Sequence, residues 1–147
     1  MKTIKRILVA LDGSTSAIHA TNYAIEFANL LNAEIEVVSI IKYAMGNIDA
    51  GILPTEVEKA NEIRALKIIK KIKNSHPNAI IKDFVIVGIP EREISKIIKE
   101  WKADLLVIGH HTHTFIERLL VKSVEKKLIN HLECPILIIP KKLNNNK

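Results

Sequence analysis

The stretch LLVIGHHTHTFIERLLVKS, residues 105–123, shows how this chain is built. Its first residues are apolar and end at Gly109, which is typical of a buried strand. A histidine-rich loop follows, and Ser123 is placed to begin a helix. In an open parallel sheet, ligands bind beyond the carboxyl ends of the strands. The stretch therefore predicts a candidate binding loop, in which Gly109 allows close backbone approach and Ser123 offers a hydroxyl and free N–H groups to an anion.

Outward from this stretch, strands and helices alternate along the chain. We expect strands at residues 4–11, 34–41, 80–87, 104–108 and 136–139, because these runs are apolar and rich in β-branched side chains. Helices are expected after the Asp12-Gly13-Ser14 turn as far as Asn32, from Thr55, from Pro90, and over 123–132. Strands separated by helices of this length form right-handed βαβ units. The pattern predicts one α/β domain over 1–147, with a frayed tail at 141–147.

The helix expected from Thr55 has a distinct start signal. Thr55 as N-cap and Glu58 three residues later form a capping box. We expect six apolar residues of this helix to face inward: Val57, Ala60, Ile63, Leu66, Ile69 and Ile72. Its lysine-rich end can be a phosphate or partner patch, but a solvated helix end is the favoured interpretation. In the strand that follows, Lys82 and Asp83 indicate an edge position.

Composition narrows the classes of protein that fit. The chain has 147 residues, 48% of them hydrophobic, which suits one globular core. No run of about 18 apolar residues is present, so no membrane span is expected. The single cysteine, Cys134, excludes an internal disulfide and favours a reducing, cytoplasmic location. The net charge of +6 comes with only 4% aromatics and no basic stripe, so nucleic-acid binding is not favoured.

Several motifs, in order, give the chain a family resemblance. They are ILVALDGS, VVSII, VGIPEREI, ADLLVIG and KSVEKKLINHLECPILIIP. Together they resemble the universal stress protein family along nearly the whole chain. The resemblance implies a three-layer, doubly wound, parallel five-stranded sheet of strand order 3-2-1-4-5, Rossmann-like and similar to adenine nucleotide alpha hydrolases. It also implies a homodimer through the last strand, residues Ile136, Leu137, Ile138 and Ile139, which would otherwise be an unpaired edge.

The nucleotide-binding members of the family that the chain resembles carry the motif G-x2-G-x9-G-[ST] after the fourth strand. Gly109 and Ser123 match the first and last positions here, whereas Thr112 and Lys122 replace the second and third glycines. Thr112 is β-branched and disfavours positive φ, so it hinders the N–H groups that would approach phosphates. Lys122 puts a long side chain beside the helix start, although as a cation it could also pair with phosphate. The loop is therefore interpreted as a degraded phosphate loop.

Two further positions match the family's nucleotide site. The resemblance implies that Asp12 faces a ribose hydroxyl or a phosphate-bound metal, and that Ile40 lines an adenine slot. A turn-forming aspartate and a core isoleucine explain the same residues equally well. Candidate nucleotide residues are thus Asp12, Ile40, Gly109, Thr112, Lys122 and Ser123. No cofactor is expected, with ATP as the open alternative.

The remaining reactive side chains give little support for catalysis or metal binding. His110, His111 and His113 lie in one loop, but neighbouring loop side chains rarely converge on one ion, so a solvated loop is favoured. No serine lies in a G-x-S-x-G turn, and Cys134 before Pro135 is expected to be a small packing residue. The prediction is a non-enzymatic, dimeric stress-response or regulatory protein. The alternatives are an ATP-binding regulatory module and an anion- or metal-sensing module using the histidine loop.

Overall fold

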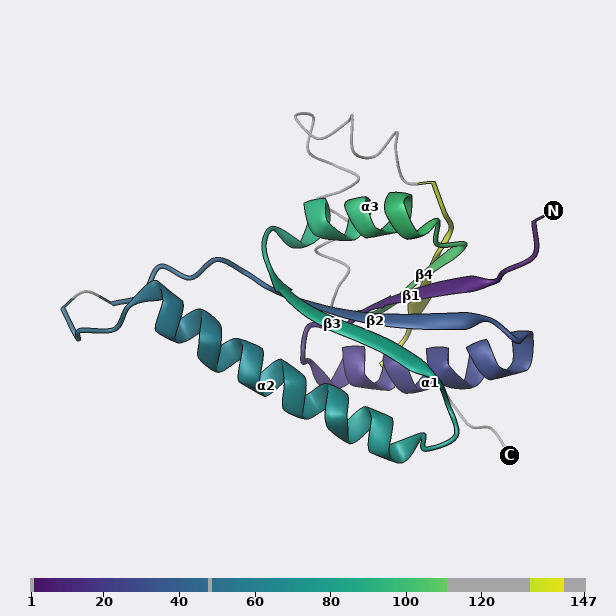
Figure 1. The fold of residues 1–147 in the computed structure, drawn as a ribbon, viewed down its shortest axis with the longest axis horizontal. Helices are drawn as coiled ribbons and strands as arrows, with labels where there is room; N and C mark the ends of the chain where they lie inside the picture. The colour runs from purple at the N-terminus through teal and green to yellow at the C-terminus, as the bar shows by residue number, and fades with distance from the viewer. Residues whose placement is uncertain (1, 48, 111–132, 142–147) are drawn as a thin grey trace.

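Five parallel strands form one sheet of order β3-β2-β1-β4-β5 in the computed structural model, which describes residues 2–47, 49–110 and 133–141. The strands are β1 (Arg6–Ala10), β2 (Glu34–Ile41), β3 (Ile81–Val87), β4 (Leu105–Gly109) and β5 (Ile136–Ile139). Helices α1 (Thr15–Leu31) and α2 (Pro54–Ser75) lie on one face of the sheet and α3 (Pro90–Trp101) on the other (Figure 1). The expected doubly wound α/β fold and its strand order are confirmed.

Most expected element bounds agree with the structure. β2 and β5 have the predicted bounds, and β3 is an edge strand as Lys82 and Asp83 indicated. β1 is shorter at both ends than the predicted 4–11, β3 begins one residue later than expected, and β4 begins and ends one residue later than the predicted 104–108. The predicted helix over 123–132 and the tail beyond 141 fall outside the described residues.

The two faces of the sheet carry separate apolar cores because side chains alternate along each strand. Toward α1 and α2, the residues Ile7, Val9, Val37 and Val107 are each at most 1% exposed. Toward α3, another buried set includes Leu8, Val38, Leu106 and Ile108, with Trp101 packed against it half-buried. The central strands β1 and β4 are buried on both faces, as expected for a parallel sheet.

Helix α1 begins and ends at the residues that the sequence indicated. The Ser14 side chain accepts a hydrogen bond from the Ala17 N–H at 3.1 Å, and the Asp12 carboxylate accepts one from the Ser14 N–H at 2.9 Å. Asn32 ends the helix in the left-handed conformation, φ 52°. These bonds satisfy N–H groups that a helix start leaves without partners and hold the turn after β1 in place.

The predicted start of α2 is wrong. The helix begins at Pro54 with Leu53 as N-cap, and the Glu56 carboxylate accepts the Leu53 N–H at 3.0 Å. Pro54 is favoured at the first helical position because its fixed φ suits that position and because it has no N–H that needs a partner. The Glu58 carboxylate instead accepts the Ala44 N–H at 3.1 Å, which ties the preceding connection to the helix.

The predicted inward face of α2 is also partly wrong. Ile69 and Ile72 are buried as expected, but Ala60, Ile63 and Leu66 are exposed. The six predicted positions were spaced by three residues, and such a series rotates by about 60° at each step around a helix with 3.6 residues per turn. It cannot remain on one face.

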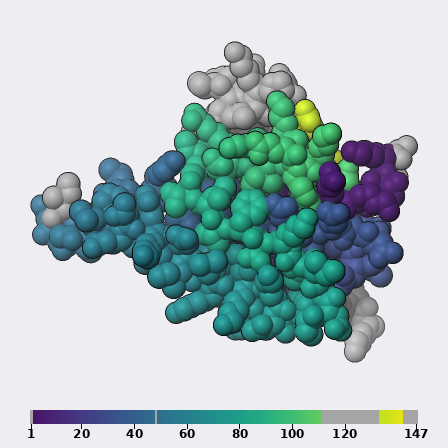
Figure 2. Space-filling model, in the orientation of Figure 1, coloured from purple at the N-terminus to yellow at the C-terminus, as the bar shows by residue number. Residues whose placement is uncertain are grey.

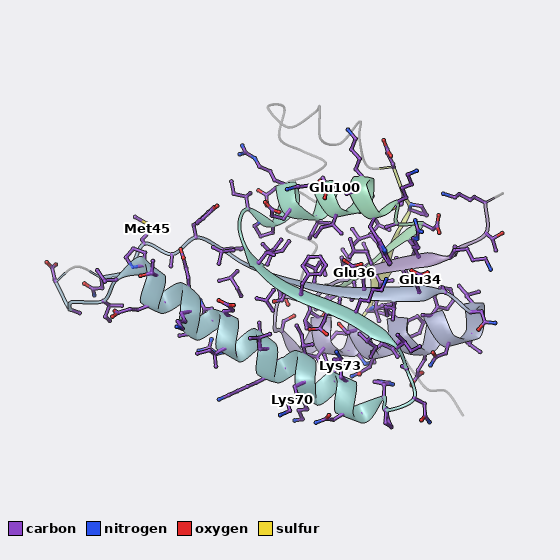
Figure 3. The ribbon with its side chains drawn as sticks, in the orientation of Figure 1. Glu34, Glu36, Met45, Lys70, Lys73 and Glu100 are labelled. Carbon is purple, nitrogen blue, oxygen red and sulfur yellow. The ribbon has the colours of Figure 1, made fainter. Side chains whose placement is uncertain are left out.

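The connection between β2 and α2, with the start of α2, projects from the body of the molecule (Figure 2). An antiparallel bridge between Asn47 and Ile52 shapes this segment. Its Tyr43 is 67% exposed and its Met45 is 93% exposed, and Figure 3 places Met45 away from the sheet. Within the described parts of the chain, no helix is long and apolar enough to cross a membrane.

Gly109 lies where β4 meets the start of α1. A Cβ placed on Gly109 would be 2.6 Å from Ser16 Oγ, 2.7 Å from the Ser16 carbonyl carbon and 2.8 Å from the Ala17 nitrogen. Two of these three atoms belong to the backbone of α1 and cannot turn aside. Glycine at this position therefore allows the end of β4 and the first turn of α1 to pack closely, at the edge where ligands bind in this class of fold.

Asp104 fastens the beginning of β1 to the chain just before β4. Its Oδ2 accepts hydrogen bonds from the Lys5 and Arg6 N–H groups at 2.8 and 2.9 Å, and its Oδ1 pairs with Lys2 Nζ at 2.9 Å. The side chain is 7% exposed. These interactions, led by the hydrogen bond from Lys2, lower the pKa of the Asp104 carboxyl below its ordinary value of 3.8.

We expect Asp104→Ala to lower the free energy of unfolding at neutral pH by about 1–3 kcal/mol, since two backbone N–H groups lose a charged acceptor. The folded-state pKa is lowered, so this stabilisation is present above pH 3.8 and is lost as the pH falls through the folded-state pKa. Urea unfolding of both proteins should therefore show a difference in stability at pH 7 that shrinks below pH 3.8.

A matched control for this change is Asp83→Ala. Asp83 pairs with Lys73 at 2.6 Å between side chains that are 21% and 44% exposed. An exposed ion pair contributes about 0–1 kcal/mol, so this control should cost less at pH 7. Equal losses in the two variants would contradict the proposed role of Asp104.

We expect Gly109→Ala to destabilise the fold by about 1–3 kcal/mol, because the added methyl group forces α1 away from β4. Gly88→Ala is the control, since the atoms nearest to its new Cβ, at 2.7 to 3.2 Å, all belong to the Glu93 side chain, which can move. Thermal unfolding measures both. A Gly109 variant as stable as the Gly88 variant would show that the contact with α1 does not require glycine.

Candidate functional site

A cavity of about 380 Å³ opens at the carboxyl ends of β1 and β2, against helix α2. We call it the α2-side pocket. Its polar lining is Asp12, Ser39, Lys42, Asn61 and Arg64, and the rest of its wall is Gly13, Ile40, Ile41, Ala65 and Ile68. The position agrees with the general rule for open parallel sheets, in which ligands bind outside the carboxyl ends of the strands.

Two of the predicted site residues, Asp12 and Ile40, line this one pocket. Asp12 is exposed in the turn after β1, and Ile40 is half-buried near the end of β2. Gly109 does not line the pocket; it packs against α1 instead. The other candidate residues, Thr112, Lys122 and Ser123, lie outside the described part of the chain.

Four polar residues of the pocket, Ser39, Lys42, Asn61 and Arg64, were missed from the sequence. Asn61 and Arg64 are on the side of α2 that faces the sheet edge, and nothing in their spacing marks them apart from other polar helix residues. Ser39 carried a signal, because it is the one polar residue within the apolar run VVSII. It is 4% exposed and lies on the same face of the sheet as Val37, toward α1 and α2.

A second hollow, of about 570 Å³, lies beside the start of α1 and is lined by Ser14, Thr15, Ser16, His19 and Lys141. Next to it, His110 Nδ1 and Ser16 Oγ are 3.2 Å apart, so the first histidine of the loop is already engaged with α1. Among residues 2–47, 49–110 and 133–141, no group of three or more histidine, cysteine or acidic side chains could hold a metal ion. His111 and His113 are not among the described residues.

Cys134 is buried in the core on the α3 side of the sheet. Burial raises the pKa of its thiol to about 11, so the thiolate needed for nucleophilic attack is scarce at neutral pH. The packing role expected for Cys134 agrees with this environment.

A third hollow, of about 270 Å³, lies between α3 and strands β2 and β3, with Glu36 and Glu100 on its wall (Figure 3). Burial raises the pKa of the Glu36 carboxyl above its ordinary value, while nearby Lys82 opposes the shift. This hollow is on the other face of the sheet from Ser39 and contains none of the predicted nucleotide residues.

Comparisons with known proteins agree with the fold. A sequence model of the Universal stress protein family matches residues 3–140. Universal stress protein MJ0531 of Methanocaldococcus jannaschii is 30% identical to this chain, over 93% of the chain and 82% of the relative. The solved structure of MJ0577 from that organism has a TM-score of 0.72 and 25% identity, over 96% of this chain and 99% of the other.

A universal stress protein family protein from Arabidopsis thaliana, solved with AMP bound, has a TM-score of 0.63 and 17% identity, over 97% of this chain and 95% of that one. At this identity the likeness concerns the fold. The family match extends from β1 to the end of β5, so it covers every described strand and helix. The chain belongs to the universal stress protein family.

Proposed function

We propose that this chain is a non-enzymatic, dimeric stress-response protein of the cytoplasm whose regulatory action does not depend on tightly bound ATP. The observation that supports this most directly is the state of the phosphate loop. Thr112 and Lys122 stand at the two positions where the motif of nucleotide-binding family members has glycine. The glycine that is retained, Gly109, has a packing role against Ser16 that needs no ligand.

The reactive groups of the described residues support a binding role over a catalytic one. Cys134 is buried with a raised pKa, and Asp104 uses both carboxylate oxygens to hold the start of the chain. Asp12 accepts a backbone N–H at the start of α1. These groups already have structural roles. The pockets at the carboxyl edge of the sheet are therefore the places where a regulatory ligand could bind.

The second candidate function is an ATP-binding regulatory module with a variant phosphate loop. It is favoured by the presence of Asp12 and Ile40 on the wall of one pocket, as expected for ribose and adenine positions. Relatives solved with AMP and with cAMP bound belong to the same fold at 17% and 24% identity. Nucleotide co-purifying with protein prepared without added ligand would favour this candidate.

The proposed dimer joins the last strands of two copies. β5 lies at an edge of the sheet and pairs with β4 through Ile108 and Ile138 among others, and no strand among the described residues pairs with its outer side. Ile138 is 46% exposed in the single chain. A second β5 would satisfy the open backbone groups and cover this side chain.

We expect isothermal titration with Mg-ATP to show no binding tighter than about 100 μM, equivalent to roughly −5.5 kcal/mol. Thr112 and Lys122 each put a side chain where phosphates would need bare backbone. Replacing both by glycine should therefore increase affinity by more than either change alone, since both affect the same phosphate path. A dissociation constant in the low micromolar range for the unchanged protein would make the ATP-binding candidate the better one.

We expect Ile138→Asp to convert the dimer to a monomer, because it places a carboxylate in the centre of the β5 interface. Ile80→Asp is the matched control: Ile80 is 89% exposed and lies immediately before β3, the opposite edge strand. Analytical ultracentrifugation, with circular dichroism to verify folding, measures the outcome. Dimers of equal strength in both variants would exclude β5 as the interface.

A further inference from the structure

We propose that the outer edge of β3 binds an extended segment of a partner protein as an added strand, with a lysine or arginine of that segment held in the hollow between α3 and strands β2 and β3. This goes beyond the proposed function, because it assigns an interaction surface and the chemistry of its partner. It depends neither on nucleotide nor on the β5 interface, since β3 and β5 are opposite edges of the sheet.

The first support is the backbone of β3, whose one strand neighbour among the described residues is β2. The Gly88 N–H donates to the Ile41 carbonyl at 2.9 Å, so every second residue back from Gly88 directs its backbone groups toward β2. The residues between them, Asp83, Val85 and Val87, therefore direct their N–H and C=O groups outward. In the described parts of the chain, no other backbone pairs with them. An edge of this kind is a template for a further strand.

The second support is the composition of β3. Edge strands resist pairing when they are short or carry charges, prolines or bulges. Lys82 and Asp83 supply charge near the amino end of β3, but residues 84–87 are all apolar, and Val87 is 36% exposed. Figure 1 shows β3 at the front of the view, with α3 above it, α2 below it and no described helix across it. With seven residues against four in β5, it is the longer template of the two edges.

The third support is the hollow of about 270 Å³ beside this edge. Its walls combine aromatic rings with an excess of carboxylates over ammonium groups: Phe84 and Trp101, with Glu36, Glu93 and Glu100 against Lys96. A lysine or arginine has the matching anatomy, because its apolar stem packs on the rings while its charged end meets carboxylates. Side chains of an added strand alternate between the two faces of the sheet, so every second one would lie on the side of this hollow.

Glu36 favours a long cationic side chain (Figure 3). It is half-buried on β2, and burial raises the pKa of its carboxyl, so an approaching cation would stabilise the ionised form. Lys82, its neighbour in the ladder, lies 3.9 Å from the Glu34 carboxylate and forms its ion pair there. An added strand would lie two strand spacings, about 10 Å, from β2, so only a long side chain could reach Glu36.

Charge also argues against a second copy of this chain as the occupant. Two β3 strands paired about a two-fold axis perpendicular to the sheet would bring two identical hollows to the same face. Each has an excess of carboxylates, so their approach is unfavourable. A partner segment with a cation at the matching position gains from the same charges.

The test uses four blocked heptapeptides of alternating threonine and valine, whose central residue is lysine, arginine, leucine or glutamate. Each is titrated into the isotope-labelled full chain and followed by NMR. We expect the lysine and arginine peptides to shift the amide signals of Asp83, Val85 and Val87 saturably, and to bind at least about tenfold tighter than the glutamate peptide. The leucine peptide should bind with intermediate affinity, because it has the backbone but not the charge.

Val85→Pro removes one outward N–H and suits an edge strand, so it should weaken binding of the lysine peptide at least about tenfold. Ile138→Pro is the matched control at the other edge. The Leu106 N–H donates to the Pro135 carbonyl, so by the same alternation Ile138 directs its backbone groups away from β4. This control should bind the peptides as the unchanged chain does. Circular dichroism verifies that both variants fold.

The charge of the hollow is tested with the edge left intact. Glu36→Gln combined with Glu100→Gln should remove the preference for the lysine peptide over the leucine peptide. Glu26→Gln combined with Glu62→Gln removes two charges from α1 and α2, on the other face of the sheet, and should preserve it. This pair of variants decides the question if Val85→Pro does not fold.

Three results would overturn the proposal. One is the absence of saturable binding up to about 5 mM for the lysine and arginine peptides. Another is equal affinity for the lysine and glutamate peptides in the unchanged chain. The third is a smaller oligomer for folded Val85→Pro in analytical ultracentrifugation without peptide, because the edge would then be occupied by a second copy.

Discussion

The close contact between the end of β4 and the first turn of α1 is the constraint on which the rest of the structure depends. Gly109 meets the backbone of Ser16 and Ala17 at a distance that leaves no space for a Cβ. This contact lets α1 lie directly on the central strands, where Ala17, Ala20, Ala24 and Ala28 are each at most 2% exposed. Small residues on the helix and a glycine on the strand together set the spacing between layers.

The spacing between α1 and the sheet determines where the polar groups of the site region lie. The turn after β1, the end of β2 and the start of the loop after β4 all reach the same edge of the sheet. Asp12, Ser39 and His110 are therefore near α1 or α2 and not in the apolar cores. The opposite end of the sheet is held by Asp104, whose carboxylate connects the start of β1 to the segment before β4. Asp104 thus holds the amino ends of the central strands, whereas the α2-side pocket lies at their carboxyl ends.

The buried strands and the exposed apolar side chains lie in different parts of the molecule. Its central strands are buried on both faces, while the connection after β2 extends outward with Met45 and Tyr43 exposed. The same helix that follows this connection, α2, contributes Asn61 and Arg64 to the pocket and Ile69 and Ile72 to the core. A ligand that contacts α2 in the pocket would therefore touch an element that is continuous with the projecting segment.

The sequence by itself determined the class of fold, the strand order through the family resemblance, and the ends of α1. These follow from local rules: apolar β-branched runs form strands, and Ser14 and Asn32 have the hydrogen-bonding and conformational preferences of helix ends. It also identified Asp12 and Ile40 as site candidates. Only the tertiary structure decided which face of α2 is buried, because apolar side chains occur on more than one side of this helix and the sheet covers Ala65, Ile69 and Ile72 but leaves Ile63 and Leu66 exposed. In the same way, Ser39, Asn61 and Arg64 line one pocket because folding brings β2 and α2 together, a contact that no local pattern encodes.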